Sequence, residues 1–325
     1  MSGHLTMDER DRIAQLHCRG FGPSAIAAAL GRAGSTISRE LRRNAVGEEY
    51  HAAQAQAKAE RRRRERPLER KMDRPETDKF VRHGLANYWS PEQIAGRLKL
   101  EFPDQPDRHV AAQTIYTWIA GQEREDRNHW RQFLRRRGRR PRRQRENAEV
   151  SAERAKIADR PQVIEQRQRL GDFEGDTVLG PPGTGGLVTL VDRRSRYSIL
   201  TKTKNKEARR VRKRIQQRLE QLPATQRRSV TFDGGKEFAS CGLLEARLGV
   251  KIYTAEPGRP YQRGTNENTN GLIRQFFPKG TDFRDVSYVE ARRVEHLLNN
   301  RPRACLGYRT PNEFQHGTSP PLDCD

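Results

Sequence analysis

Three short segments near the start of the chain carry apolar residues at the three- and four-residue spacing of amphipathic helices. The first should begin with a capping box, in which the side chains of Thr6 and Glu9 each bond a backbone N–H of the same turn. The second should end at Gly31, and a third should run over residues 36–43 behind Ser35, which is placed to cap it. Two short helices, a glycine-containing turn and a third helix predict a helix-turn-helix.

The third of these helices is the one that would enter a DNA groove. Ile37 and Leu41 are four positions apart and should pack on the core, which leaves the polar residues on other faces. The alternative is a small helical bundle whose basic face is only solvated. The arginines on this helix favour DNA binding, and we assign residues 1–46 to a helix-turn-helix domain. Its candidate DNA-binding residues are Thr36, Arg39, Arg42 and Arg43.

Residues 47–80 and 81–122 show weaker patterns. The first stretch, with its arginine run at 61–64, predicts a basic linker or a long exposed helix, for which phosphate contact and simple solvation both remain open. The second stretch predicts another helical unit, in which Ser90 and Gln93 form a capping box. This unit is either a second helix-turn-helix or a spacer bundle with a tryptophan and tyrosine core.

An arginine-rich stretch follows. Nine of the fifteen residues in 131–145 are arginine, and Gly138 and Pro141 argue against one continuous helix. We expect residues 123–165 to form a flexible linker that follows DNA phosphates without sequence specificity. The candidate phosphate contacts are Arg139, Arg140, Arg142 and Arg143.

From residue 166 the pattern changes to short apolar runs typical of strands, separated by amphipathic helices. Three strands, a helix, a strand, a helix, a strand and two further helices predict an α/β domain with a mixed sheet over residues 166–316, followed by a tail at 317–325. The expected strands are 173–179, 187–191, 197–201, 229–232 and 250–253, and the expected helices are 208–222, 243–248, one from 265, and 288–299.

Three acidic residues occupy positions in this domain where catalytic side chains gather. Asp176 lies in the first expected strand, Asp233 ends the fourth, and Glu267 begins a helix. Carboxylates that converge in a cleft repel one another, and divalent cations with oxygen ligands, such as Mg²⁺, relieve that repulsion. Taken singly, each of these acids is better interpreted as an ordinary surface charge, so the case for a site depends on the surrounding pattern.

Composition and charge narrow the class of partner. The net charge is +22 in 325 residues, which favours a polyanion, with nucleic acid first and a membrane surface as the rival. The sequence has no run of eighteen apolar residues and no apolar signal region at its N-terminus, so we expect a cytoplasmic protein without membrane contact. The four cysteines are scattered, which argues against a zinc cluster or a disulfide framework.

Several long segments, in order, resemble the DDE transposases of the insertion sequence thirty family of bacteria, whose catalytic domain has the retroviral-integrase, ribonuclease H-like fold. The resemblance covers nearly the whole chain outside the linkers. The matching segments are STISRELRRN at 35–44, YWSPEQIAGRL at 88–98, GDFEGDTVLG at 171–180, LVTLVDRRSRYSIL at 187–200, TFDGGKEFA at 231–239, PYQRGTNENTNGLIRQFFPKGTDF at 260–283 and LNNRPRACLGYRTPNEF at 298–314.

The resemblance implies that Asp176, Asp233 and Glu267 form the catalytic triad and hold two Mg²⁺ or Mn²⁺ ions. It further implies a mixed five-stranded sheet, binding to the terminal inverted repeats of an insertion sequence and to target DNA, and cleavage and strand transfer by a homodimer or higher oligomer. Residues on the same helix as Glu267 would contact DNA or orient Glu267, and these are Asn266, Asn270 and Arg274.

Two positions depart from the family pattern. The family usually has asparagine where this chain has Gly234, and tryptophan where it has Phe173. Phe173 should be a tolerated core change, whereas Gly234 removes a polar side chain beside the expected metal site. The other carboxylates near the triad, which rank below it as metal ligands, are Asp172, Glu174 and Glu237.

Two alternatives remain open from the sequence. The first is a transposase-derived DNA-binding regulator that has lost catalysis. The departure at Gly234 slightly favours this alternative, and the intact triad argues against it. The second is a ribonuclease H-like nuclease that acts on RNA–DNA hybrids. Helix-turn-helix elements argue against the second, because they enter the major groove of B-form DNA and the A-form groove excludes them.

Overall fold

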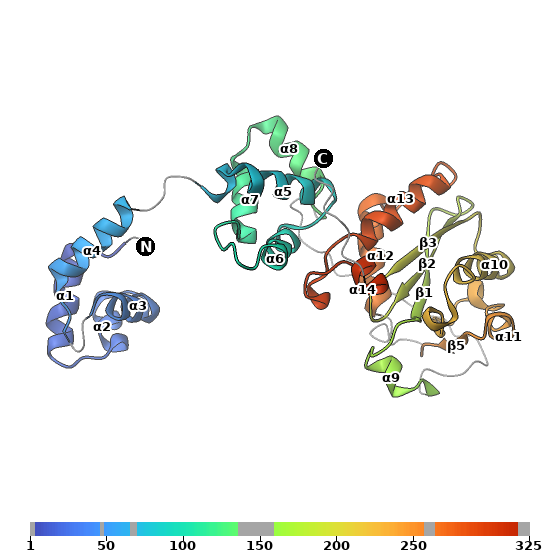
Figure 1. Ribbon diagram of the computed structural model, residues 1–325, viewed down its shortest axis with the longest axis horizontal. Helices are drawn as coiled ribbons and strands as arrows, with labels where there is room; N and C mark the ends of the chain where they lie inside the picture. Colours follow the sequence, from blue (N-terminus) through green and yellow to red (C-terminus); the bar gives the residue numbers. More distant parts are fainter. Residues whose placement is uncertain (1–3, 46–48, 66–69, 136–158, 257–263, 318–325) are drawn as a thin grey trace. The chain divides into compact units, whose positions relative to one another are not determined.

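The chain folds into two compact units, Met1–Arg70 and Lys71–Asp325 (Figure 1). Each unit has hydrophobic clusters of its own, so each is described separately. The computed structural model describes residues 4–45, 49–65, 70–135, 159–256 and 264–317.

The first unit is a small helical domain. Its capping box at Thr6 and Glu9 is present, and the second helix ends at Gly31 in the left-handed conformation that glycine favours, as the sequence predicts. Ile13, Ile26 and Ile37, one from each of the first three helices, are fully buried and form the centre of its core. The helices are α1 (Met7–Cys18), α2 (Pro23–Leu30), α3 (Gly34–Asn44) and α4 (Ala52–Arg64).

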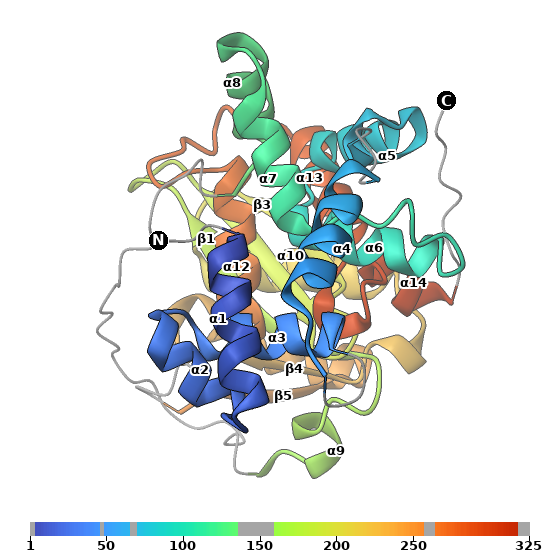
Figure 2. The ribbon, with the colours of Figure 1, turned by 90° about the vertical axis from the view of Figure 1, so that its left-hand side faces the viewer.

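Two details of this unit differ from the prediction. Helix α3 begins two residues earlier than expected, with Ala33 at its N-cap, so Ser35 lies inside the helix and does not cap it. Residues 52–64 form a helix, which was one of the two alternatives, but α4 lies against α1 (Figure 2) and buries Ala52 and Ala55 in the core of the unit. The first unit therefore continues well beyond the predicted boundary at residue 46.

A buried ion pair ties the helices of the first unit together. Arg10 on α1 donates through Nε to Glu40 on α3 at 2.9 Å, and both residues are at most 9% exposed. The hydroxyl of Tyr50 donates to the same Glu40 oxygen at 3.0 Å, and Arg10 also donates to Gln56 on α4 at 2.7 Å. Because each charge has partners, the pair is tolerated in the interior.

The second unit opens with a helical bundle. It starts at Lys71 and continues through Trp130, which is buried in its core, so it is longer than the predicted 81–122. The predicted capping box at Ser90 and Gln93 is present. The bundle's helices are α5 (Pro75–Ala86), α6 (Pro91–Glu101), α7 (Ala112–Gly121) and α8 (Arg124–Gln132).

The rest of the second unit is an α/β domain with the mixed five-stranded sheet that the sequence predicts, in the order β3-β2-β1-β4-β5. β1 pairs antiparallel with β2 and parallel with β4, β2 pairs antiparallel with β3, and β4 pairs parallel with β5. This agrees with the mixed five-stranded sheet that the resemblance implies. The strands are β1 (Asp172–Leu179), β2 (Gly186–Asp192), β3 (Ser198–Thr203), β4 (Ser229–Phe232) and β5 (Lys251–Thr254).

Helices cover both faces of this sheet (Figure 1). One hydrophobic cluster packs α10 and α11 on the face to which Phe173 points, and that fully buried residue is the core position expected for it. A second cluster packs α12 and α13 on the opposite face, to which Val178 points. The helices are α9 (Gln162–Glu165), α10 (Ala208–Leu219), α11 (Leu243–Leu248), α12 (Gly264–Phe276), α13 (Tyr288–Asn299) and the unpredicted α14 (Pro311–His316).

Within the second unit, the bundle is joined to the α/β domain by a buried contact. Both terminal nitrogens of Arg97 on α6 donate to the two carboxylate oxygens of Glu313 on α14, at 2.7 and 2.6 Å. Glu313 holds the pKa of Arg97 above its usual value, although burial alone would lower it. Beside this pair, a Cβ added to Gly96 would collide with the ring of Tyr308. Two segments 216 positions apart thus pack as one interface.

Candidate active site and DNA-binding surface

Asp176 and Asp233 come from neighbouring parallel strands. Glu174 on β1 pairs with Thr231 on β4, and each aspartate lies two positions further along its own strand direction. Because side chains alternate across a strand and neighbouring strands lie about 4.8 Å apart, the same register places the two aspartates side by side on one face. That face is the one to which Val178 also points, and α12 covers it. The structure therefore brings these two predicted ligands together.

Aromatic packing fixes the opposite face of the sheet below this pair. A Cβ on Gly175, between Glu174 and Asp176, would collide with the ring of Phe232. The Phe232 ring in turn stacks on Phe238, with ring centroids 4.4 Å apart. Gly175 is therefore needed for close packing, and Phe238 anchors the segment that follows Asp233.

The segment after Asp233 brings another acid into the site. The backbone N–H of Gly235 donates to Asp233 Oδ1 at 3.1 Å, and the hydroxyl of Thr177 donates to Glu237 Oε1 at 3.3 Å. A Cβ on Gly235 would lie 2.9 Å from Asp233 Oδ1 and 2.7 Å from Glu237 Oε2. Glu237 thus lies next to Asp233, as expected for one of the carboxylates near the triad, and the turn at Gly235 brings it there.

Glu267 lies in the first turn of α12 and is exposed. Its position depends on the start of that helix, where the backbone N–H of Asn266 donates to Glu174 Oε2 at 3.0 Å. Among the described residues, no three acidic, histidine or cysteine side chains converge closely enough to hold a metal ion. The structure thus pairs Asp176 with Asp233 and leaves the Glu267 side chain outside that pair.

The polar residues of α12 take roles that the sequence left open. The Asn270 amide donates to Asp176 Oδ2 at 2.8 Å, so it orients Asp176 and not Glu267. Asn266 is fully buried, and its side-chain amide has no hydrogen-bond partner among the described residues. Arg274 donates to the backbone carbonyl of Leu179 at 2.9 Å. These contacts favour positioning roles over direct contact with DNA.

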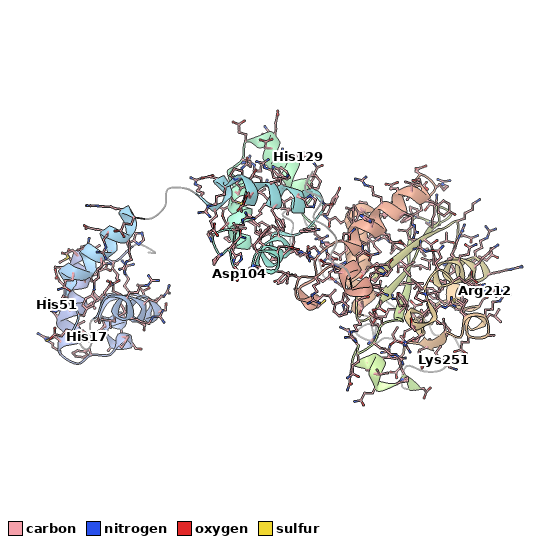
Figure 3. All side chains as sticks on the ribbon, viewed as in Figure 1. His17, His51, Asp104, His129, Arg212 and Lys251 are labelled. Carbon is pink, nitrogen blue, oxygen red and sulfur yellow. The ribbon has the colours of Figure 1, made fainter. Side chains whose placement is uncertain are left out.

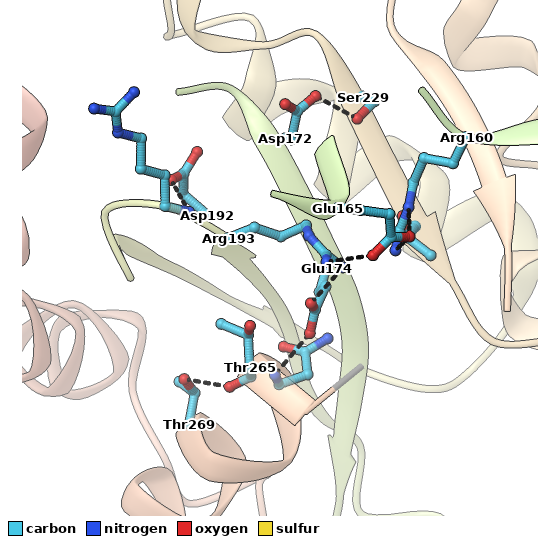
Figure 4. A network of polar contacts seen from close by, with 12 residues as sticks. Arg160, Glu165, Asp172, Glu174, Asp192, Arg193, Ser229, Thr265 and Thr269 are labelled. Atoms are coloured by element: carbon cyan, nitrogen blue, oxygen red, sulfur yellow. Dashed lines mark hydrogen bonds and ion pairs between the residues drawn. The ribbon is translucent and has the colours of Figure 1, made fainter. Parts of the chain in front are cut away.

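Two other acids of β1 serve the fold. Asp172 accepts from the hydroxyl of Ser229 at 2.6 Å and pairs with Arg169 at 2.9 Å. Glu174 is fully buried and pairs with Arg193 at 2.9 Å (Figure 4). Both carboxylates are occupied by these contacts, which agrees with their rank below the triad as metal ligands.

The donor chemistry at the strand ends suits a hard divalent cation. Asp176, Asp233 and Glu237 offer only carboxylate oxygens, the ligands that Mg²⁺ prefers, beside the hydroxyl of Thr177. Asp233 and Glu237 carry like charges that lie close together around Gly235, and a cation would relieve their repulsion. These carboxylates are of the type that binds a divalent cation, although no three acidic side chains of the described residues converge closely enough to form a complete metal site.

The predicted DNA-binding residues of α3 lie on the surface of the first unit. Arg39, Arg42 and Arg43 are exposed, and Thr36 is half-buried. A hollow of about 360 Å³ beside α3 is lined by Thr36, Arg39 and Arg43 together with Arg62 of α4. The α4 helix thus adds a basic residue to the predicted surface.

Basic side chains also project from the rest of the described chain, as the nitrogen tips in Figure 3 show. The exposed Lys251, at the start of β5, is one of them. The candidate phosphate contacts of the arginine-rich stretch fall outside the described residues, and these are Arg139, Arg140, Arg142 and Arg143.

Comparisons with known proteins agree with both parts of this picture. A helix-turn-helix domain family matches residues 3–44. The chain is 39% identical over 319 residues to the transposase InsI for insertion sequence element IS30A of Escherichia coli, which covers 96% of this chain and 83% of that protein. The chain belongs to the IS30 family of insertion-sequence transposases. Its helix-turn-helix domain fits DNA binding, and its α/β domain is consistent with a transposase catalytic domain.

Other members of the IS30 family match along almost their whole length. The transposase for insertion sequence element IS4351 of Bacteroides fragilis is 37% identical, over 96% of this chain and 95% of that protein. The transposase for insertion sequence element IS1086 of Cupriavidus metallidurans is 36% identical, over 94% and 92%. In the part of the transposase that the structure describes, no helix is long and apolar enough to cross a membrane.

Proposed function

We propose that this transposase uses Asp176, Asp233 and Glu267 to cleave and join DNA with two bound Mg²⁺ or Mn²⁺ ions. The observation that carries the proposal is the parallel register of Glu174 on β1 with Thr231 on β4. Continued by two residues, that register sets Asp176, within β1, beside Asp233, just after β4, on the face that α12 covers. Glu267, in the first turn of that helix, is the third ligand. The metal ions would activate the attacking oxygen and stabilise the leaving oxygen.

The residues around the triad keep its carboxylates ready for these ions. Asn270 and the backbone N–H of Thr177 each donate to Asp176, at 2.8 Å in both cases. The N–H of Gly235 does the same for Asp233. Both aspartates are partly exposed, so a DNA phosphate can approach them from solvent.

Two successive reactions would take place at this site. In the first, water attacks a phosphodiester at the element end, which breaks the P–O3′ bond and frees a 3′-hydroxyl. In the second, that hydroxyl attacks a phosphate of the target DNA, forms the new P–O bond and expels the target's own 3′-oxygen. The product is an integrated element end, and no nucleotide cofactor is consumed.

The first unit would select the DNA on which this chemistry acts. Arg39, Arg43 and Thr36 line the hollow beside α3 and would contact the terminal inverted repeats. Because two element ends must be joined to one target, the working form would be a homodimer or a higher oligomer on DNA. Its place of action would be the bacterial cytoplasm, where the nucleoid lies.

The test is a cleavage and strand-transfer assay on DNA that carries the element ends, with Mg²⁺ or with EDTA. Wild type should give joined products only with metal, and Asp233→Asn should give none while still binding the ends. The control is Asp285→Asn, which removes an exposed acid elsewhere in the same unit. Specific binding without product from wild type, in Mg²⁺ and in Mn²⁺, would instead support the regulator, with Gly234→Asn as the first change to try.

The DNA-binding part is tested by Arg39→Ala. We expect weaker binding to element ends, by about tenfold, with little change on random DNA, as for a base contact. Arg12→Ala on α1 removes the same charge from another exposed position of this unit and serves as the control. Equal loss on both DNAs would mean that Arg39 contacts only phosphate.

A further inference from the structure

One network of polar contacts links α9, β1, β4 and the start of α12 (Figure 4). Glu165 of α9 accepts from Arg160 at 2.7 Å and from Arg193 at 3.2 Å. Arg193 continues to Glu174 on β1 at 2.9 Å, and Arg160 continues to the hydroxyl of Thr231 on β4 at 3.0 Å. Glu165 therefore connects two arms, one to each central strand.

The arms end close to each member of the triad. Glu174 precedes Asp176 by two residues on β1, and Thr231 precedes Asp233 by two residues at the end of β4. The third contact is made by Glu174, whose second oxygen accepts the N–H of Asn266, the residue before Glu267. On a strand, residues two apart share a face, so the network and the triad lie on the same side of the sheet.

The Glu174 side chain, which holds the start of α12, has little freedom to move. Glu174 is fully buried and its partner Arg193 is 4% exposed. Each carboxylate oxygen of Glu174 accepts a hydrogen bond from a different donor. A carboxylate is also well placed at a helix N-terminus, where the exposed N–H groups carry partial positive charge. Removing Arg193 would leave the buried Glu174 without its ion-pair partner, which is costly, whereas removing Glu174 would leave Arg193 with its contact to Glu165.

We propose that Glu174 is a positioning residue for strand transfer: with Arg193, it fixes the first turn of α12 and so sets where Glu267 stands relative to Asp176. This inference rests on the proposed triad. Glu174 itself would bind neither metal nor DNA and would act only by positioning Glu267. Glu165 supports the same arrangement from outside, because it holds Arg193 in line with Glu174 and Arg160 in line with Thr231.

The sharpest variant is Glu174→Gln, because an amide offers only one acceptor oxygen where a carboxylate offers two. That oxygen will turn to the charged Arg193, which leaves an NH₂ group facing the N–H of Asn266. The start of α12 should then be released while the volume of the side chain is kept. In the double variant Glu174→Gln with Arg193→Met, the amide oxygen is available to Asn266 again, and the helix start should be held.

Asp172→Asn is the matched control. Asp172 is another buried carboxylate on β1 with one arginine partner and one hydroxyl partner, and its side chain is bonded to Arg169 and Ser229 and not to α12. Its loss should lower the stability of the sheet to a similar degree. It should leave the position of Glu267 unchanged.

The first measurement is hydrogen exchange of the full chain, read on the peptide that covers the start of α12. We expect Glu174→Gln to speed exchange at residues 264–268 at least tenfold, with Asp172→Asn near wild type and the double variant largely restored. Unchanged exchange in Glu174→Gln would show that Glu174 does not hold the helix, and the proposal would be wrong.

The second measurement is the metal concentration that gives half-maximal strand transfer. Glu174→Gln should raise it at least tenfold and the double variant should bring it back, whereas Asp172→Asn should stay within about twofold of wild type. Faster exchange with an unchanged metal requirement would reduce Glu174 to a structural role and leave the triad standing. A wild-type protein without metal-dependent products would instead defeat the proposed function, and the positioning role with it.

Discussion

At the scale of single residues, the site depends on neutral donors as much as on acids. Asn270 gives Asp176 a hydrogen-bond partner on α12, and Thr177 gives Glu237 one on β1. The acidic triad could be proposed from its sequence motifs, whereas the approach of Asp176 to Asp233 required the parallel pairing of β1 with β4, which the predicted strand ranges did not contain. The sequence named Glu237 as a nearby carboxylate, but its hydrogen bond from Thr177 could not be predicted, because it depends on how the turn at Gly235 packs against β1.

Asn270→Ala tests the role of that donor. Without the amide, Asp176 keeps its place on β1 but loses the partner that orients it, so we expect a rate of strand transfer about tenfold lower and a higher metal requirement. Asn268→Ala, at an exposed position of the same helix, is the control. Equal activity in the two variants would show that the Asn270 amide has no part in the reaction.

Glu9 gives the first unit a predictable dependence on pH. The hydrogen bond from Arg32, and then that from the Thr6 N–H, lower the pKa of Glu9 to about 2. The folded pKa lies below the unfolded one, so the contribution of Glu9 to stability is complete above about pH 5 and is lost as the pH falls towards 2. The unfolded state takes up the proton first across that range.

Scanning calorimetry of the full chain measures this contribution. Glu9→Gln should melt at a lower temperature than wild type at pH 7, and the gap should close as the pH approaches 2. Asp11→Asn, which changes an exposed acid on the same helix, should show no such convergence. A gap between wild type and Glu9→Gln that is the same at both pH values would contradict the assigned cause.

At the scale of elements, periodicity predicted the strands and most helices, because their apolar residues repeat at clear intervals. It misjudged α4, whose buried positions are alanines in an otherwise polar helix, so the sequence carried little sign that Ala52 and Ala55 are covered. It also placed the N-cap of α3 at Ser35, whereas the chain enters the helix at Gly34. Both errors arise from tertiary packing, which outweighs local preference.

The contact between α6 and the segment before α14 makes an element-scale prediction. Gly96→Ala should destabilise the second unit by about 1–3 kcal/mol, because the new Cβ meets the ring of Tyr308. Tyr308 has a φ of 65°, which glycine adopts more easily, so adding Tyr308→Gly should recover part of the loss.

Urea unfolding provides the measurement. Gly121→Ala is the control, because a Cβ there, at the end of α7, has nothing within 4 Å. If Gly96→Ala is no less stable than Gly121→Ala, the two segments do not pack as described.

At the scale of the whole molecule, the chain divides into the first unit, with the helix-turn-helix, and the larger second unit, with the α/β domain. Both units contribute to its net charge of +22. The sequence placed the first boundary at residue 46 and treated the second helical segment as separate. The structure instead ends the first unit at Arg70 and joins the bundle to the α/β domain through Arg97 and Glu313. No local sequence pattern predicts a contact between residues that are 216 positions apart.

Removing residues 1–70 should therefore abolish the preference for element ends without unfolding the rest of the chain. We expect the remaining chain to keep a cooperative thermal transition, because its hydrophobic clusters are its own. It should still bind DNA in a salt-dependent way, but its preference for element ends over random DNA should fall to about one. Binding titrations at two salt concentrations would show this, and retained preference would place end recognition in the bundle.

The Arg97–Glu313 contact also decides where parts of related transposases can be exchanged. A hybrid joined within residues 136–158 would take α6 from one parent and α14 from the other, so the buried pair and the fit of Gly96 to Tyr308 would have to match across the two parents. A hybrid joined at residue 70 keeps both sides of that interface from one parent. The first unit is thus the part of this chain that can be exchanged without rebuilding that interface.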